Sequence, residues 1–502
     1  MENSEDSTEL VSQMLQKLSI ATEEERKSLL NEARPYLLAP DASAKFKDHL
    51  ESGNFAVIFD CLNTADQAMV KTTCEILSRV FDFVDSKVVI SQYDENLLRA
   101  LKHPMPEVKE VVLKVLIKGL QFGCHKQALA VQAGKCLIDK ELSVSKQSHK
   151  FIKSMANLRT YQNQIQIFVE PYLSTIKEML QNPDDALKLR VLDLLVEICG
   201  ISQEHLEMVD KEGLLNDLFI DLKKDDDVLV QLNAIEIVSN LAESNQGFEY
   251  LKNLNILTNM DIRLNQISSG GLGHFLMPGY IKFFGRLAHH DPTEYPNLYP
   301  NFAAILRNML QQSDQIILAL EVFGHIGLSN QGKKVLLQNP DVLEILAKSI
   351  KSGTSEVKTR SMSVFADILR NTEEQNLDLD STKEIFLNLN GQNSMDYVTD
   401  LAKKPFGDLS TSAYEVLMAV SVYPWSIEMM LNVPGFFEFL LDRSTAKDKE
   451  SKDSKYALIC AICGQKEVQN IIPPEILKQL RNYVKQGAFY VEATVEVAIE
   501  EQ

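Results

Sequence analysis

The stretch Leu173–Cys199, LSTIKEMLQNPDDALKLRVLDLLVEIC, contains two apolar segments separated by a short polar turn. In the second segment Leu187, Val191, Leu194 and Ile198 recur at the spacing that places them on one face of an α-helix. The stretch therefore predicts a pair of amphipathic helices. A pair of this size cannot bury its apolar faces alone, so we expect it to pack against neighbouring pairs.

The same pattern of helix, polar turn and helix recurs along the chain. The clearest further copies are LLNDLFIDLKKDDDVLVQLNAIEIVSNLA (214–242), FAAILRNMLQQSDQIILALEVFGHIGL (302–328) and LEILAKSIKSGTSEVKTRSMSVFADIL (343–369). This repetition predicts an all-α fold, an armadillo/HEAT-like solenoid (a superhelix of stacked helices).

Residues marking the turn before each second helix lie 37 to 52 residues apart. A helical period of about 40–47 residues is typical of armadillo and HEAT arrays. An acidic marker can also accept hydrogen bonds from the free N–H groups of the helix that follows. The markers are Asp66, Glu107, Val144, Asp184, Asp226, Gly270, Asp314, Glu356, Asp408 and Asp453.

No proline-rich or serine-rich linker divides the chain, which favours one continuous array. We predict an N-terminal helical cap over 1–50 and about ten repeats over 51–490. A longer insertion is expected near 371–396, and a flexible acidic tail over 491–502.

The composition is that of a globular protein with an acidic surface. Of 502 residues, 45% are apolar and 24% charged, and 51 basic against 70 acidic side chains give a net charge of −19. Because phosphate contacts require clustered lysines and arginines, this balance argues against nucleic acid as a partner.

The N-terminal sequence MENSEDSTEL lacks the basic and then apolar order of a signal peptide, and no apolar run reaches the length of a membrane helix. The seven cysteines lie mostly in apolar helical contexts, as reduced core residues do. We therefore expect a cytoplasmic protein, also compatible with the nucleus, with no membrane contact.

Motifs for catalysis, metals and cofactors fail when their spacing is checked. Cys460 and Cys463 have the separation of a zinc pair, but no second pair exists and both fall in a predicted helix. The segment from Asp378 lacks the glycine and glutamate of a calcium loop, and Asp225–Asp227 is more simply a helix cap. No Walker, GxSxG or HExxH sequence occurs. We expect no enzyme activity, cofactor or metal.

Two features invite a functional reading but have a structural alternative. The stretch SSGGLGHFLMPGYIKFFGRLAHHDP (268–292) suggests a phosphate loop beside a metal site, yet Gly270 falls where the repeat predicts a turn, and Pro278 suits the first turn of the next helix. Trp425, the single tryptophan, is placed at the end of a helix, where it either packs between repeats or acts as an exposed anchor.

The second helices of stacked pairs usually line the binding face of such arrays. Their polar positions are therefore candidates for partner contact, each with a solvated charge as the alternative. The candidates are Lys188, Glu236, Asn240, Lys282, Arg286 and Glu321.

Several segments resemble the 26S proteasome non-ATPase regulatory subunit 5 family. They are MPGYIKFFGRLA (277–288), VPGFFEFLLDRSTAKDKESKDSKYAL (433–458), DVLVQLNAIEIVSNLA (227–242) and GAFYV (487–491), and the likeness runs in the same order from about residue 50 to 491. The resemblance implies a non-enzymatic helical-repeat chaperone for assembly of the proteasome regulatory particle base.

The resemblance also implies a set of partners. It implies binding to the C-terminal domain of one base ATPase subunit, with a second base ATPase and a large non-ATPase scaffold subunit held in the same precursor module, and release before the proteasome is complete. The polar residues of the shared segments add four candidate contacts: Asp442, Arg443, Lys452 and Lys455. For these four, a structural role in capping and ion pairing around the last repeat stands as an equal alternative to partner contact.

Two other classes of function remain as alternatives. One is a transport or trafficking receptor built from helical repeats, although a single tryptophan cannot form the repeated Trp-x-x-x-Asn array of armadillo importers. The other is an enzyme with an unfamiliar helical fold. The histidines argue against this class, because they are scattered along the sequence without a partner motif.

Overall fold

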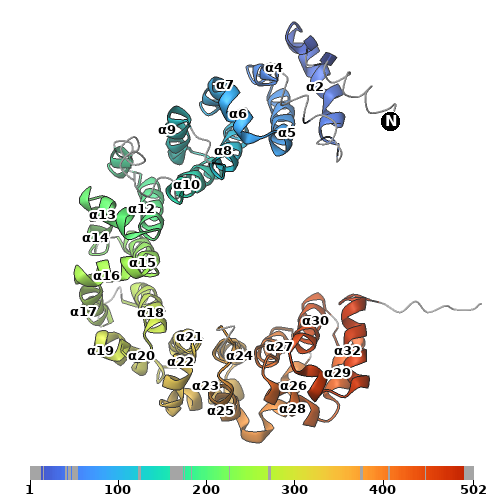
Figure 1. Ribbon diagram of the computed structural model, residues 1–502. Coiled ribbons are helices and arrows are strands. Elements are labelled where there is room, and N and C mark those ends of the chain that lie inside the picture. Colours follow the sequence, from blue (N-terminus) through green and yellow to red (C-terminus); the bar gives the residue numbers. More distant parts are fainter. Residues whose placement is uncertain are drawn as a thin grey trace, which may run out of the picture. The chain divides into compact units, whose positions relative to one another are not determined.

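The structure is a computed structural model of the chain. It describes residues 13–14, 16–39, 42, 47, 55–122, 126–158, 173, 176–182, 184–224, 227–268, 273–372, 377–404, 407–446 and 448–490. These residues form helices joined by short turns, and no strand occurs among them (Figure 1). The predicted all-α helical-repeat fold is confirmed. The chain divides into two compact units, Met1–Tyr250 and Leu251–Gln502.

In the first unit the longer helices α2, α5, α8, α10, α12 and α15 pack side by side in chain order, and shorter helices form a second layer. The bounds are α2 Glu23–Leu37, α4 Ala56–Asp60, α5 Gln67–Phe83, α6 Ser86–Gln92, α7 Asp94–Ala100, α8 Pro106–Leu120, α9 Gln127–Lys135, α10 Leu142–Ala156, α12 Asp185–Cys199, α13 Gln203–Lys211, α14 Asn216–Asp221, α15 Val228–Ala242 and α16 Asn245–Asn253, the last reaching into the second unit.

The second unit repeats this arrangement, with α18, α21, α24, α27, α30 and α32 packed side by side in one layer. Its bounds are α17 Ile256–Ser268, α18 Gly273–His290, α19 Tyr295–Leu298, α20 Pro300–Met309, α21 Ile316–Ile326, α22 Asn330–Leu337, α23 Pro340–Ser352, α24 Ser355–Leu369, α25 Leu379–Asn390, α26 Ser394–Ala402, α27 Gly407–Val420, α28 Pro424–Asn432, α29 Phe436–Leu441, α30 Lys449–Gly464, α31 Val468–Ile471 and α32 Pro474–Gln486.

Helix starts follow the predicted capping chemistry at two of the markers. Asp66 and Asp184 are the N-caps of α5 and α12, and each side chain accepts backbone N–H groups of the first turn. Asp227, the third aspartate of the acidic run, is the N-cap of α15. Asp225 and the marker Asp226 lie outside the described residues. The marker Asp453 was placed too late, because α30 already begins at Lys449 behind the cap Asp448.

From Gly273 onward the glycine-rich stretch is part of the scaffold, whereas the turn predicted at Gly270 lies outside the described residues. Residues 269–272 lie outside the described residues, and α18 begins at Gly273, so Pro278 lies inside the helix rather than in its first turn. A side chain at Gly273 would meet the Ile267 carbonyl oxygen at 1.9 Å, which explains the glycine. The predicted apolar stripe of Ile281, Phe284, Leu287 and Ala288 is confirmed as buried.

Trp425 was placed at the wrong end of a helix. Pro424 occupies the first position of α28, where its missing N–H costs nothing, so the Pro-Trp pair begins this helix. The indole is 7% exposed and packs against the rings of Phe386 and Tyr423, with centroids 5.5 and 5.7 Å away. Trp425 is therefore a packing residue of the second unit.

Side chains of one repeat cap helix ends of the next. The Lys118 ammonium on α8 donates to the carbonyl oxygens of Phe81 and Asp82 at the end of α5, at 2.8 and 2.9 Å. In the second unit the buried Lys333 of α22 donates to the carbonyl of Arg370, the C-cap of α24, at 3.0 Å. These donors satisfy carbonyls that no helix can pair internally.

Candidate functional site: a groove between α5 and α8

A groove of about 550 Å³ runs between α5 and α8 on the longer-helix layer of the first unit. Its wall carries three cationic and four acidic side chains around a small apolar floor. We call it the α5–α8 groove, and it is lined by Leu38, Lys71, Cys74, Glu75, Ser78, Arg79, Asp82, Glu107, Glu110, Val111 and Lys114.

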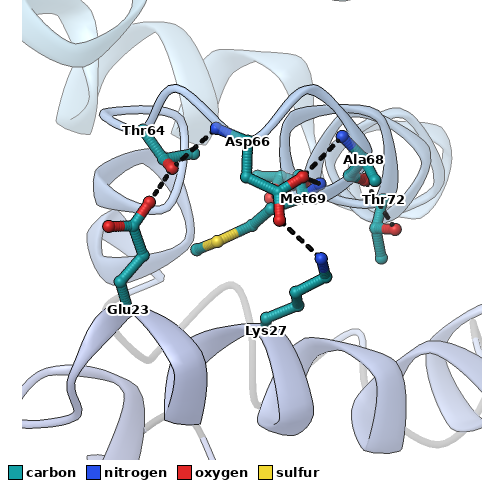
Figure 2. Close-up of polar contacts among 8 residues, drawn as sticks. Glu23, Lys27, Thr64, Asp66, Ala68, Met69 and Thr72 are labelled. Atoms are coloured by element: carbon teal, nitrogen blue, oxygen red, sulfur yellow. Dashed lines mark hydrogen bonds and ion pairs between the residues drawn. The ribbon is translucent and has the colours of Figure 1, made fainter.

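The start of α5, one of the two helices beside this groove, is held by a network of polar contacts with α2 (Figure 2). Asp66 Oδ1 accepts hydrogen bonds from the backbone N–H groups of Ala68 and Met69 at 2.9 and 3.2 Å. Its second oxygen lies 2.5 Å from the Lys27 ammonium, which joins α5 to α2. The Lys27 hydrogen bond holds the pKa of Asp66 below its ordinary value, aided by the backbone N–H groups. One carboxylate thus caps α5 and fastens it to α2.

We expect Asp66→Ala to lower the thermal midpoint of the first unit, because both the cap and the contact with Lys27 are lost. The folded pKa is depressed, so the contribution of Asp66 is present above the unfolded pKa and is lost as pH falls through the folded pKa. Melting followed by far-UV circular dichroism at neutral and acidic pH measures both effects. Asp82→Ala is the control, since that carboxylate caps no helix, and an equal fall in both variants contradicts the assignment.

The groove charges are partly paired with one another. Arg34 Nη2 lies 2.6 Å from Glu75 Oε2, and Lys71 Nζ lies 3.9 Å from Glu107 Oε1. The second carboxylate oxygen of Glu107 is buried without a hydrogen-bond partner among the described residues. Lys114 is exposed and forms no ion pair within the described part of the chain. The groove therefore presents both cationic and acidic groups, not all of which are paired among the described residues.

Cys74, at the base of the groove, is not set up as a nucleophile. Burial raises the pKa of its thiol to about 12, and the carboxylates of Glu107, Glu110 and Glu75 add to the rise. A nucleophilic cysteine needs a lowered pKa, because the thiolate is the reactive species. Cys74 is therefore a buried packing residue at the base of the groove.

Three of the residues predicted to contact a partner are engaged within the array. Lys188 on α12 lies 3.0 Å from the buried carboxylate of Asp221. Glu321 on α21 lies 2.5 Å from the Arg360 guanidinium, and the Asn240 amide donates to Asp193 at 3.5 Å. Each of these pairs joins one repeat to the next.

Four other predicted residues lie on helix surfaces. Glu236 on α15 and Lys282 on α18 are exposed, whereas Arg286 on α18 and Lys452 on α30 are half-buried. Glu236 belongs to the first unit, and Lys282, Arg286 and Lys452 belong to the second, where they lie on the two helices α18 and α30.

The remaining predicted residues, Asp442, Arg443 and Lys455, lie together near the last helix. Asp442 caps the short 3-10 turn that follows, accepting the Ser444 N–H at 2.9 Å. The Lys455 ammonium is buried and donates to the Asp442 carbonyl at 2.6 Å and to the Thr445 hydroxyl at 2.5 Å. This is the capping alternative stated for these residues.

Arg443 completes the same arrangement at the end of α32. Its guanidinium carbon lies 3.6 Å from the centroid of the Tyr483 ring, and it donates to the Gly487 carbonyl at 2.8 Å. Cation–π stacking and carbonyl capping both hold the end of the last helix.

A cluster on α10 and α12 was not anticipated from the sequence. Among the described residues, His149, Asp193 and Glu197 form a group whose possible ligand atoms lie within 4.8 Å of one another. Glu197 Oε2 is, however, contacted by His149 at 3.0 Å and by the Lys153 ammonium at 2.9 Å. Burial raises the pKa of Glu197, but these hydrogen bonds outweigh it, and the net direction is downward. Lys153 already supplies the positive charge, so this is an ion-pair network between two repeats.

Sequence reasoning also missed the α5–α8 groove. Its charged residues lie on α5 and α8, the second helices that begin near the markers Asp66 and Glu107. The predicted contacts lie in the same way on later second helices. Applying the same rule of exposed second-helix positions to the first repeats would have found Lys71, Glu75 and Lys114.

The layered helix pairs and the groove define an all-α helical-repeat protein of the armadillo/HEAT class. Yeast importin-beta (Kap95p) has a similar fold, with a TM-score of 0.54 and 13% identity, covering 94% of this chain and 61% of that one. At this identity the likeness shows the fold alone. None of the helices in the described ranges has the length and hydrophobicity needed to cross a bilayer.

Comparison of the sequence identifies the family. The chain belongs to the proteasome non-ATPase 26S subunit family, whose family model matches residues 11–502. It is 28% identical over 458 residues to the 26S proteasome non-ATPase regulatory subunit 5 of Homo sapiens, covering 88% of this chain and 90% of the relative. The Drosophila melanogaster protein of the same name is 26% identical over 463 residues, covering 89% of each chain. The resemblance drawn from the sequence is confirmed.

Proposed function

We propose that this protein is a non-enzymatic chaperone for assembly of the 26S proteasome regulatory particle base. The observation that carries the proposal is the family match across nearly the whole chain, together with relatives named as proteasome regulatory subunits. The groove and the buried, protonated Cys74 are compatible with binding rather than chemistry. The work would take place in the cytoplasm and also in the nucleus.

The proposed partner is the C-terminal domain of one base ATPase subunit. A second base ATPase and a large non-ATPase scaffold subunit would be held in the same precursor module until release. A preformed array binds without a large ordering cost, because its surface is fixed before the partner arrives. Occupying the ATPase domain would keep its tail from docking early onto the core particle, a steric effect that requires no cofactor.

The role can be tested by pull-down of each isolated base ATPase C-terminal domain with the full chain. We expect one domain to be retained over the others. Retention of none, or of all equally, overturns the proposal. Glu75→Lys/Glu110→Lys then tests the α5–α8 groove, with Glu344→Lys/Glu384→Lys on exposed helix positions of the second unit as the charge-matched control. Loss of retention in the groove variant alone places the contact there.

A further inference from the structure

One segment of this acidic protein has the opposite charge. Residues 111–158 contain eight lysines and no arginine, against two acidic residues, whereas the whole chain has 51 basic and 70 acidic residues. Such local reversal of charge is a signal for an interaction surface. The lysines are Lys114, Lys118, Lys126, Lys135, Lys140, Lys146, Lys150 and Lys153.

Several of these lysines are already used within the fold. Lys118 caps the end of α5, and Lys126 lies 2.5 Å from Asp94. Lys153 lies 2.9 Å from Glu197. The segment therefore contains structural lysines as well as lysines that need another explanation.

Lys146 and Lys150 need that explanation. Both are exposed on α10, a helix without any acidic residue, and neither forms an ion pair in the part of the chain that the structure describes. They are four residues apart, with Lys153 three further on, so the three share one face of the helix. Like charges at this spacing repel each other, and α10 has no acidic side chain to offset the repulsion.

Leu142, the first residue of α10, continues this face, and a second exposed apolar side chain, Ile138, lies in the 3-10 turn before the helix. Leu142 lies four residues before Lys146 and is 50% exposed, and Ile138, just before it, is 49% exposed. We define the α10 basic face as Ile138, Leu142, Lys146, Lys150 and Lys153. It offers an apolar contact at one end and the positive charges of Lys146 and Lys150 beyond it, whereas Lys153 is paired with Glu197.

We propose that the α10 basic face binds an acidic peptide segment of a partner protein. In this arrangement an aliphatic side chain of the segment covers Ile138 and Leu142, and its carboxylates pair with Lys146 and Lys150. The proposal does not depend on the assembly role, because it rests on a surface outside the α5–α8 groove lining and on charge complementarity alone.

A peptide fits this face better than a nucleic acid. Planar bidentate recognition of phosphate is the work of arginine, and residues 111–158 contain none. A net charge of −19 also repels a polyanion as it approaches, whereas a short peptide needs only local pairing. The apolar end of the face has no counterpart on a phosphate backbone.

Fluorescence polarisation with the full chain tests the proposal. The probe is a short fluorescein-labelled peptide in which glutamates alternate with leucines, compared with the same peptide carrying glutamines in place of glutamates. We expect Lys146→Glu/Lys150→Glu to weaken binding of the acidic probe about tenfold, since two exposed pairs become repulsive. Leu142→Ser should weaken it less, through the aliphatic contact.

Matched controls separate this surface from general charge effects. Lys348→Glu/Lys383→Glu changes the net charge equally at exposed helical positions of the second unit and should leave the affinity unchanged. No binding by the unaltered chain at low salt, equal losses in both double variants, or equal binding of the glutamine peptide overturns the proposal. The proposal is also overturned if single-stranded oligothymidylate binds as tightly as the acidic peptide and loses that binding in Lys146→Glu/Lys150→Glu. The face would then be a phosphate-binding surface. Far-UV circular dichroism confirms that each variant is folded.

Discussion

Replacing Phe284 with alanine is expected to lower the free energy of unfolding of the Leu251–Gln502 unit by about 3–5 kcal/mol. The Phe284 side chain on α18 is fully buried. Its ring lies 5.4 Å from that of Phe302, 4.9 Å from that of Tyr299 and 5.0 Å from that of Phe283, between centroids. Truncation removes these contacts and leaves a cavity that rigid neighbouring helices cannot close.

The single tryptophan makes this measurement specific. Trp425 lies in the second unit and is buried, so its fluorescence during urea denaturation reports the unfolding of that unit. Phe275→Ala is the matched control, because Phe275 lies on the same helix and is 57% exposed. Equal shifts of the midpoint in the two variants contradict the packing role assigned to Phe284.

Lys455→Ala is expected to destabilise the same unit by about 2–4 kcal/mol. The Lys455 side chain is buried, and its ammonium lies 4.9 Å from the Phe439 ring in addition to its two hydrogen bonds. Alanine leaves the Asp442 carbonyl and the Thr445 hydroxyl without this donor, and also opens a cavity. Lys455→Met, which keeps an apolar stem, should cost about 1–2 kcal/mol.

The control for this prediction is Lys452→Ala, on the same helix and half-buried. Trp425 fluorescence again follows the unfolding. A loss in Lys452→Ala as large as that in Lys455→Ala contradicts the structural role, and so does retention of full stability in Lys455→Ala.

The Lys455 pKa gives this substitution a pH signature. Burial lowers the pKa from 10.5 to about 8, a fall that Arg443 increases and that Asp442 only partly offsets. Between these two values the unfolded chain binds more protons at this position than the folded one. Stability relative to Lys455→Met should therefore rise as pH rises through this window. Curves of unfolding free energy against pH that run parallel for the unaltered protein and Lys455→Met contradict this prediction.

The fold was predictable because its determinants are local. The helical periodicity, the caps Asp66 and Asp184 and the buried stripe of α18 all lie within one repeat of sequence. Local reasoning was wrong at the marker Asp453, which lies inside α30, and at two prolines. Pro424 begins a helix instead of ending one, and Pro278 is accommodated inside α18.

The state of individual charges was not predictable in the same way. Lys188, Asn240 and Glu321 look like surface residues on their own helices, and their partners lie 33, 47 and 39 residues away. Pairing at this distance depends on the stacking of neighbouring repeats, which a single helix does not reveal. The repeat period does indicate where to search, since each partner lies about one repeat away.

The capping of one repeat's helix by a side chain of another has a consequence for how the array unfolds. Lys118, Lys333 and Arg443 each complete the end of a helix outside their own. When one repeat opens, its neighbour loses a donor as well as an apolar contact, and carbonyls at that helix end become unpaired. Nearest-neighbour coupling is thereby strengthened, so local openings detected by hydrogen exchange should span groups of adjacent repeats within a unit rather than single helix pairs.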